Sequence, residues 1–179
     1  MGASEWSRRV AYQPDIAAAL QQARDDAYRD GDYYRTEADA RARKVSEQDW
    51  VAAERAFIAQ EYGEDEAADM DDSQARAVWR AAQVEVSGPD TLLASQPFSG
   101  THSVIDMSEV DDEPGFGVVA PLPDDDLRSW FGTLRPATAA VERALGEGLS
   151  GFARWQGAYT IGYAGDQPEA IFFFGWSGD

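Results

Sequence analysis

The sequence predicts an α+β protein in which N-terminal helices pack on a small, mainly antiparallel sheet with a C-terminal β-hairpin. Apolar residues recur at helical spacing through the first half of the chain and alternate at strand spacing near its end. Helices followed by antiparallel strands favour an α+β arrangement. Because the chain has 179 residues, we expect a single domain over residues 1–179.

The first predicted helix covers residues 14–31. Ile16, Leu20 and Ala23 recur at steps of three and four, which puts them on one face. Asp15 suits the start of this helix and Gly31 suits the position just after its end. The tyrosines at 33 and 34 follow, available for packing or for a short strand.

Two further helices are predicted, over residues 46–62 and 73–86, after a charged connection or irregular helix at 36–44. Ser46 can cap the first of them, and Gly63 ends it. The expected apolar stripes are Trp50, Ala53, Phe57 and Ile58 in the first helix and Ala75, Val78, Trp79 and Ala82 in the second. The acidic residues 64–72 between them are expected to form a loop.

The middle of the chain is predicted to be irregular. Glycine and proline cluster in residues 87–100, which we interpret as the connection between the two halves. A short strand over 101–107, an acidic loop and a brief strand at 118–120 are expected next. Short helices are predicted over 123–132 and 135–148.

The C-terminal hairpin is predicted from residues 152–164 and 169–177. Trp155, Tyr159, Ile161 and Tyr163 alternate with smaller or polar residues in the first arm, and a Gly-Asp-Gln-Pro turn follows. The second arm is apolar on both faces, as in a covered inner strand. The residues expected in the core are Ile171, Phe173 and either Phe172 or Phe174.

The net charge of −18 is concentrated in the middle of the chain. Residues 47–90 carry twelve acids and three bases, a charge of −9, and residues 91–127 carry eight acids and no base, a charge of −8. A field of this sign repels nucleic acid and anionic membranes and attracts basic partners. It also simply keeps a protein in solution, so the charge alone leaves both interpretations open.

Composition excludes several chemistries. The chain has no cysteine and one histidine, which removes disulfides, cysteine-ligated zinc and multi-histidine metal centres. No Gly-Lys-Ser/Thr loop is present, and we expect no cofactor and no metal. The N-terminus lacks the apolar run of a secretory leader, and no stretch of about 18 apolar residues occurs. A cytoplasmic protein without nucleic-acid or membrane binding is therefore expected, and its oligomeric state stays open.

Two acidic segments, residues 61–72 and 108–126, are expected to form surface for a basic protein partner. The second also offers oxygen ligands, but its spacing does not match an EF-hand loop, so a solvated loop is expected. The candidate partner-binding residues are Glu64, Asp65, Glu66, Asp69, Asp71, Asp72, Asp111, Asp112 and Glu113.

The segment Ser-Gly-Thr-His-Ser-Val-Ile-Asp-Met holds the lone histidine, His102. His102 and Asp106 are the catalytic candidates, with His102 as a general base. Neighbours on a strand point to opposite faces, so Thr101 and Ser103 share a face and neither is expected to be the direct partner of His102. Polar side chains at a strand entry can equally serve structure alone. If the C-terminus lies on an adjacent strand, Asp179 could approach His102.

Three stretches carry a resemblance: "VAYQPDIAAALQQARDDAYRDGDYY", "SGTHSVIDM" and "EAIFFFGWSGD". In this order they resemble a group of small, uncharacterised acidic actinobacterial proteins with a Gly-Thr-His-Ser centre and a Ser-Gly-Asp C-terminus. The resemblance covers the ends and centre of the chain and implies one domain, but no reaction. It draws attention to Gly100, Thr101, His102, Ser103, Gly175, Ser177, Gly178 and Asp179.

The sequence is compatible with two functions. The first is an acidic interaction protein, of the immunity or inhibitor type, that binds a basic partner through the middle of the chain. The second is a small enzyme or ligand-binding protein that uses the polar cluster around His102.

Overall fold

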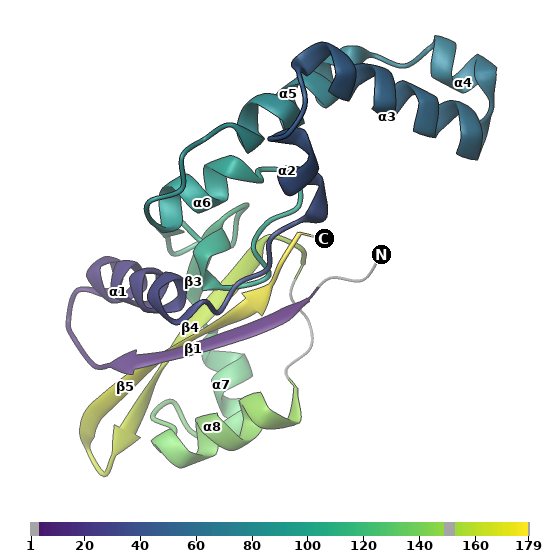
Figure 1. The fold of residues 1–179 in the computed structure, drawn as a ribbon. Coiled ribbons are helices and arrows are strands. Elements are labelled where there is room, and N and C mark those ends of the chain that lie inside the picture. Colours follow the sequence, from purple (N-terminus) through teal and green to yellow (C-terminus); the bar gives the residue numbers. More distant parts are fainter. Residues whose placement is uncertain (1–3, 149–152, 179) are drawn as a thin grey trace. The chain divides into compact units, whose positions relative to one another are not determined.

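The computed structural model describes residues 4–148 and 153–178. They form two compact units. We call the first the sheet unit, which combines the chain up to Tyr34 with the chain from Gly100 onward. The second, the helical unit, spans Arg35–Ser99. The fold class is α+β, as predicted (Figure 1), while the single domain stays a prediction. None of the described helices is long and apolar enough to cross a bilayer.

The described strands form one five-stranded mixed sheet in the order β1-β5-β4-β3-β2. Strands β1, β5 and β4 pair antiparallel, and β3 and β2 continue the sheet in parallel. The bounds are Glu5–Ala11 for β1, Glu109–Val110 for β2, Val118–Pro121 for β3, Gln156–Ala164 for β4 and Gln167–Trp176 for β5. The predicted C-terminal hairpin and the strand near 118–120 are confirmed, and β1 is a strand that the sequence analysis did not predict.

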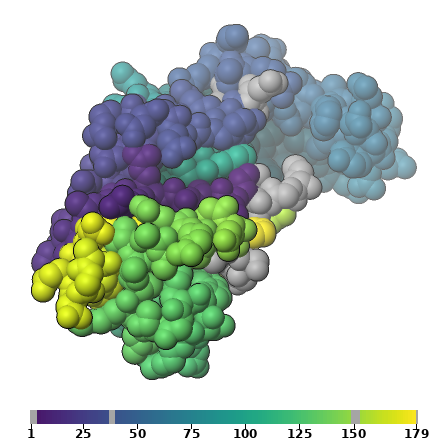
Figure 2. Space-filling view, turned by 90° about the horizontal axis from the view of Figure 1, so that it is seen from below, coloured from purple at the N-terminus to yellow at the C-terminus, as the bar shows by residue number. Residues whose placement is uncertain are grey.

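Strand β5 forms the centre of the core because it is covered on both faces. Phe172 and Phe174 pack with residues of α7 (Asp124–Phe131) and α8 (Thr138–Glu147) on one face. By strand alternation, Ile171 and Phe173 point to the other face, the side on which α1 (Ile16–Asp30) packs (Figure 1). Ile171 and Phe173 are buried as predicted, and both Phe172 and Phe174 are buried where only one of them was expected. Figure 2 shows, in green, the residues around α7 and α8 as they cover their side of the sheet unit.

Residues at its two ends determine where helix α1 begins and stops. The Asp15 side chain accepts a hydrogen bond from the Ala18 amide at the N-terminus, and Gly31 ends the helix in a left-handed conformation with φ 71°. Both positions agree with the sequence prediction. Leu20 and Ala23 lie on the buried face of the helix.

The helical unit contains α2 (Glu37–Ala42), α3 (Glu47–Tyr62), α4 (Glu64–Ala68), α5 (Asp72–Ala82) and α6 (Pro89–Ser95). Ser46 caps α3 through the Asp49 amide, as predicted. Its core is made largely of small side chains. The buried cluster of α2, α3 and α5 consists of Ala42, Trp50, Val51, Ala75 and Ala82.

Several local predictions are wrong. Residues 64–72 are not a plain loop, because Glu64–Ala68 form α4. The connection predicted at 87–100 does hold a boundary between the units, after Ser99, but it also contains α6, whose Leu92 is fully buried. In the predicted stripe of α3 only Trp50 is buried, whereas Ala53 and Phe57 are exposed. The residues do recur at helical spacing, but among the described side chains of the helical unit none buries Ala53 or Phe57.

Candidate functional site

The segment around His102 is a buried polar turn and not the predicted strand. Gly100 has φ 67° and His102 has φ 55°, so the chain turns twice through the left-handed region. The Ser103 hydroxyl then accepts a hydrogen bond from the Ile105 amide at 3.2 Å and caps a short 3₁₀ helix, η1 (Val104–Asp106). A strand cannot form because these side chains satisfy the local backbone groups that a strand would pair with its neighbour.

Asp106 closes this turn from inside the sheet unit. Its Oδ1 accepts hydrogen bonds from the Thr101 amide at 2.6 Å and from the Thr101 hydroxyl at 2.8 Å. The Thr101 and Ser103 hydroxyls lie 3.0 Å apart, which results from the turn and not from the strand alternation on which the predicted shared face was based. The contacts that fix the Asp106 carboxyl therefore come from Thr101.

Burial dominates the chemistry of Asp106. It raises the pKa of this carboxyl to about 6, although the hydrogen bonds from Thr101 and the nearby His102 act in the opposite direction. Among the described residues Oδ2 has no hydrogen-bond partner. It points instead at the Gly100 backbone, where an added Cβ would lie 2.8 Å from it. Glycine at position 100 is thus required by both conformation and space.

His102 itself is half-buried at the edge of this turn. Its ring stacks on the Tyr34 ring, with centroids 4.7 Å apart, and its Nδ1 lies 3.4 Å from the Ser4 hydroxyl. Beside it lies a hollow of about 200 Å³. The other residues that line it are Glu5, Trp6, Ser7, Arg8, Asp32, Ser103 and Val104. Pockets for drug-sized ligands are usually larger, about 300–1,000 Å³.

Trp155 joins the central segment to the C-terminal segment. An added Cβ would lie 2.9 Å from its ring at Gly100 and 1.6 Å from it at Gly178, so both glycines lie against the indole. Trp155 has φ 60°, a costly conformation for a large side chain. The Phe116 ring lies 4.9 Å from the indole on the surface.

Ser177 completes this junction. Its amide donates to the Ser4 carbonyl at 2.9 Å, and its hydroxyl lies within hydrogen-bond reach of the same residue. The Gly-Thr-His-Ser and Ser-Gly segments therefore meet through Ser4 and Trp155, and not as adjacent strands. The predicted approach of Asp179 to His102 lies outside the described residues.

The predicted partner-binding acids are on the surface. Glu64, Asp65, Glu66, Asp69 and Asp71 are exposed and Asp72 is half-buried in the helical unit. In the sheet unit, Asp111, Asp112 and Glu113 are all exposed. Asp111 also orders its own loop, because its carboxylate accepts hydrogen bonds from the amides of the next two residues.

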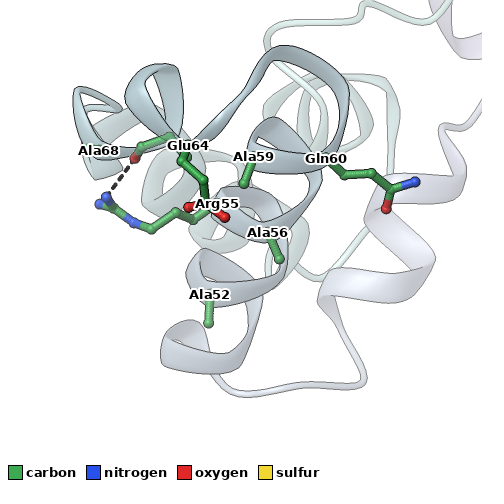
Figure 3. A pocket seen from close by; sticks show the side chains of 8 residues that line it. Ala52, Arg55, Ala56, Ala59, Gln60, Glu64 and Ala68 are labelled. Carbon is green, nitrogen blue, oxygen red and sulfur yellow. Dashed lines mark hydrogen bonds between the residues drawn. The ribbon is translucent and has the colours of Figure 1, made fainter.

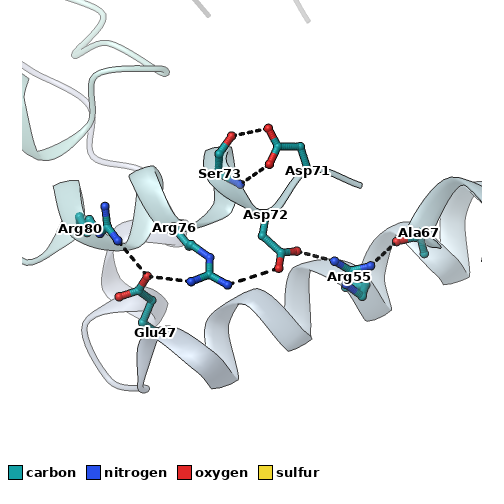
Figure 4. Close-up of polar contacts among 8 residues, drawn as sticks. All are labelled: Glu47, Arg55, Ala67, Asp71, Asp72, Ser73, Arg76 and Arg80. Carbon is teal, nitrogen blue, oxygen red and sulfur yellow. Dashed lines mark hydrogen bonds and ion pairs between the residues drawn. The ribbon is translucent and has the colours of Figure 1, made fainter. Parts of the chain in front are cut away.

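Two of these acids take part in internal contacts of the helical unit (Figure 4). Asp71 caps α5, and its hydrogen bonds with Ser73 lower the pKa of the Asp71 carboxyl. Asp72 pairs with Arg55 at 2.5 Å, which lowers the pKa of the Asp72 carboxyl. The same guanidinium donates to the Ala67 carbonyl at 2.7 Å. Arg55 is therefore fully engaged between α4 and α5.

Glu64, Asp65, Glu66 and Asp69 differ from this pair. In the part of the chain that the structure describes, none of these four carboxylates forms an ion pair. Glu64 also lines a hollow of about 610 Å³ between α3 and α4 (Figure 3). Five alanines also line this hollow: Ala52, Ala56, Ala59, Ala67 and Ala68.

Trp155 and Ser4 could not be predicted as parts of the His102 region, because only the folded sheet brings them to it. Phe57 was assigned to a core, yet its ring is 55% exposed. No group of three or more potential metal ligands occurs within residues 4–148 and 153–178. The chain matches no protein-family model, no curated protein and no solved structure.

Proposed function

We propose that this chain is an acidic, cytoplasmic interaction protein that binds a basic protein partner, in the manner of an immunity or inhibitor protein. One observation carries the proposal. Residues 47–72 contain ten acids and a single base, Arg55, and that base is already held by Asp72 and the Ala67 carbonyl. Glu47 also pairs with Arg76 and Arg80. The acids of this stretch that form no ion pair among the described residues are available to an incoming basic surface.

The four unpaired carboxylates Glu64, Asp65, Glu66 and Asp69 are the centre of the proposed surface. Asp71 and Asp72 add to the negative electrostatic potential of this surface and at the same time stabilise α5. In the sheet unit, Asp111, Asp112 and Glu113 add a second exposed acidic loop. Such charges act mainly on the rate of encounter and on partner choice, so the affinity should fall as salt screens them.

The test starts from capture of partners from the native host at low salt, followed by reconstitution of the complex from purified proteins. We expect a basic partner whose Kd rises at least about tenfold between roughly 50 and 300 mM salt. The quadruple variant Glu64→Gln, Asp65→Asn, Glu66→Gln, Asp69→Asn should weaken binding by at least the same factor.

A matched variant removes the same charge elsewhere: Asp25→Asn, Glu147→Gln, Asp166→Asn, Glu169→Gln. All four of these residues are exposed in the sheet unit, and this variant should bind nearly as well as the wild type. The proposal is contradicted if the partner is not basic or if the Kd does not change with the salt concentration. Equal losses in the two quadruple variants contradict the assignment of the surface.

A second candidate function is the binding or conversion of a small polar ligand at His102. The observation that favours it is the hollow beside a histidine held at φ 55°, since such backbone strain is frequent at functional sites. His102→Gln separates the two functions, because glutamine keeps one hydrogen bond but does not titrate. An interaction protein should bind its partner unchanged, whereas a His102 site should lose its ligand.

A further inference from the structure

An apolar groove lies between α3 and the connection that precedes it in the helical unit. Its volume is about 460 Å³. Val45, Trp50, Ala53 and Phe57 form its apolar wall. Val45 is 41% exposed and Phe57 is 55% exposed, so this wall presents apolar surface to solvent, a feature typical of binding surfaces.

The walls of the groove are fixed by hydrogen bonds within the helical unit. The Arg43 guanidinium donates to the carbonyls of Ala82 and Val84, at 2.6 and 2.9 Å. The Trp79 indole donates to the Val45 carbonyl at 3.1 Å, and the buried Trp50 indole donates to the Ala75 carbonyl at 3.0 Å. The groove is therefore preformed, and a ligand would not have to order it at its own entropic cost.

Two carboxylates bracket the exposed ring of Phe57. Glu54 precedes it by three residues and Glu61 follows it by four, spacings that place all three side chains on one side of α3. Neither glutamate takes part in an ion pair among the described residues. Arg41, Lys44 and Asp49 also line the groove, so its lining carries charges of both signs.

We propose that this groove binds an amphipathic helix of the basic partner, an inference that rests on the proposed function. The apolar stripe of that helix contacts Val45, Ala53 and Phe57, and its lysines or arginines pair with Glu54 and Glu61. Aromatic side chains at the centre of such contacts carry much of the binding energy. A second copy of this chain fits poorly, because it would bring another segment of the same acidic charge against α3.

The experiment uses the full chain and a labelled synthetic peptide of about 18 residues with leucine at helical spacing, lysine along one edge and glutamine elsewhere. Fluorescence anisotropy gives its Kd. We expect Phe57→Ala to raise the Kd at least about tenfold and Glu54→Gln with Glu61→Gln to raise it several-fold. The matched controls are Tyr62→Ala, another exposed aromatic of α3, and Glu147→Gln with Glu169→Gln. Each should change the Kd less than about twofold.

Each alternative outcome would contradict a specific part of the proposal. If a scrambled peptide of the same composition binds equally well, or if Phe57→Ala and Tyr62→Ala have the same effect, the groove is not the site. The proposed function then survives on its own salt-dependent partner. If the same peptide with glutamate in place of lysine binds as tightly, the charge argument is wrong. If Phe57→Ala instead abolishes a concentration-dependent self-association, the occupant is a second copy.

Discussion

The sheet unit and the helical unit bury different kinds of side chain. In the sheet unit, the four consecutive large residues Ile171–Phe174 are all buried. In the helical unit, the core cluster is three alanines with Trp50 and Val51, while the rings of Phe57 and Tyr62 remain exposed. Since apolar burial supplies most of the stability of a fold, the aromatic side chains of β5 contribute to the stability of the sheet unit, whereas the exposed rings of Phe57 and Tyr62 contribute little to that of the helical unit.

The largest expected effect compares the same truncation in the two units. Phe173→Ala should lower the free energy of unfolding by about 3–5 kcal/mol, because it empties a fully buried site. Phe57→Ala should change it by less than about 0.5 kcal/mol, as an exposed substitution in a helix usually does. Urea denaturation of both variants measures this. If the two variants lost a similar free energy of unfolding, the contrast drawn between the two units would be wrong.

The next effect concerns the turn at Gly100. Gly100→Ala should destabilise the protein by about 2–5 kcal/mol, since it adds left-handed backbone strain and overpacks the contact with Asp106 and Trp155. Gly132→Ala is the control for strain alone, because Gly132 has φ 70° but open space around its Cα. Thermal and urea unfolding should rank Gly100→Ala as clearly the more damaging. Equal losses would show that the tight packing contributes nothing.

The smallest effect is a pH dependence from Asp106. Its pKa is raised to about 6 in the folded state, above the value of about 3.9 for an unfolded chain. The folded state therefore binds the proton more tightly, and the contribution to stability is present below pH 4 and lost as the pH rises through 6. Two pKa units correspond to at most about 3 kcal/mol.

Asp106→Asn isolates that contribution. The amide keeps an oxygen for the Thr101 hydrogen bonds and does not titrate. Relative to the wild type, this variant should therefore become more stable as the pH rises from 4 to 7. Urea denaturation of both proteins across this range gives the difference. Two curves that stay parallel would mean that Asp106 titrates alike in the folded and unfolded chains.

Local signals in the sequence predicted much of the fold. Asp15, Gly31 and Ser46 end or cap their helices through contacts with residues a few positions away, and the β4–β5 hairpin is also a local structure. These features depend on short-range chemistry, which a sequence displays directly. The exposure of the predicted acidic residues could be predicted as well, because a charged side chain by itself favours contact with water.

Two kinds of contact account for what could not be predicted. The segment at Thr101 has the spacing of a strand, but hydrogen bonds to Asp106, five residues further on, hold it in a turn. The other contacts join residues that are far apart in the sequence. Trp155 lies against Gly100 and Gly178 only because the sheet brings three distant segments together. Phe57 matches a core stripe by spacing, and nothing in its own helix indicates that no partner covers it.

The pairing of β1 with β5 has a consequence for biosynthesis. Glu5 pairs with Trp176, so β1 is synthesised well before β5, the strand with which it pairs. The helical unit, built from contacts close in sequence, can form while the chain is still growing, because local contacts form fast. An interrupted translation product would therefore carry β1 as an unpaired strand, which is prone to aggregation and recognition by chaperones.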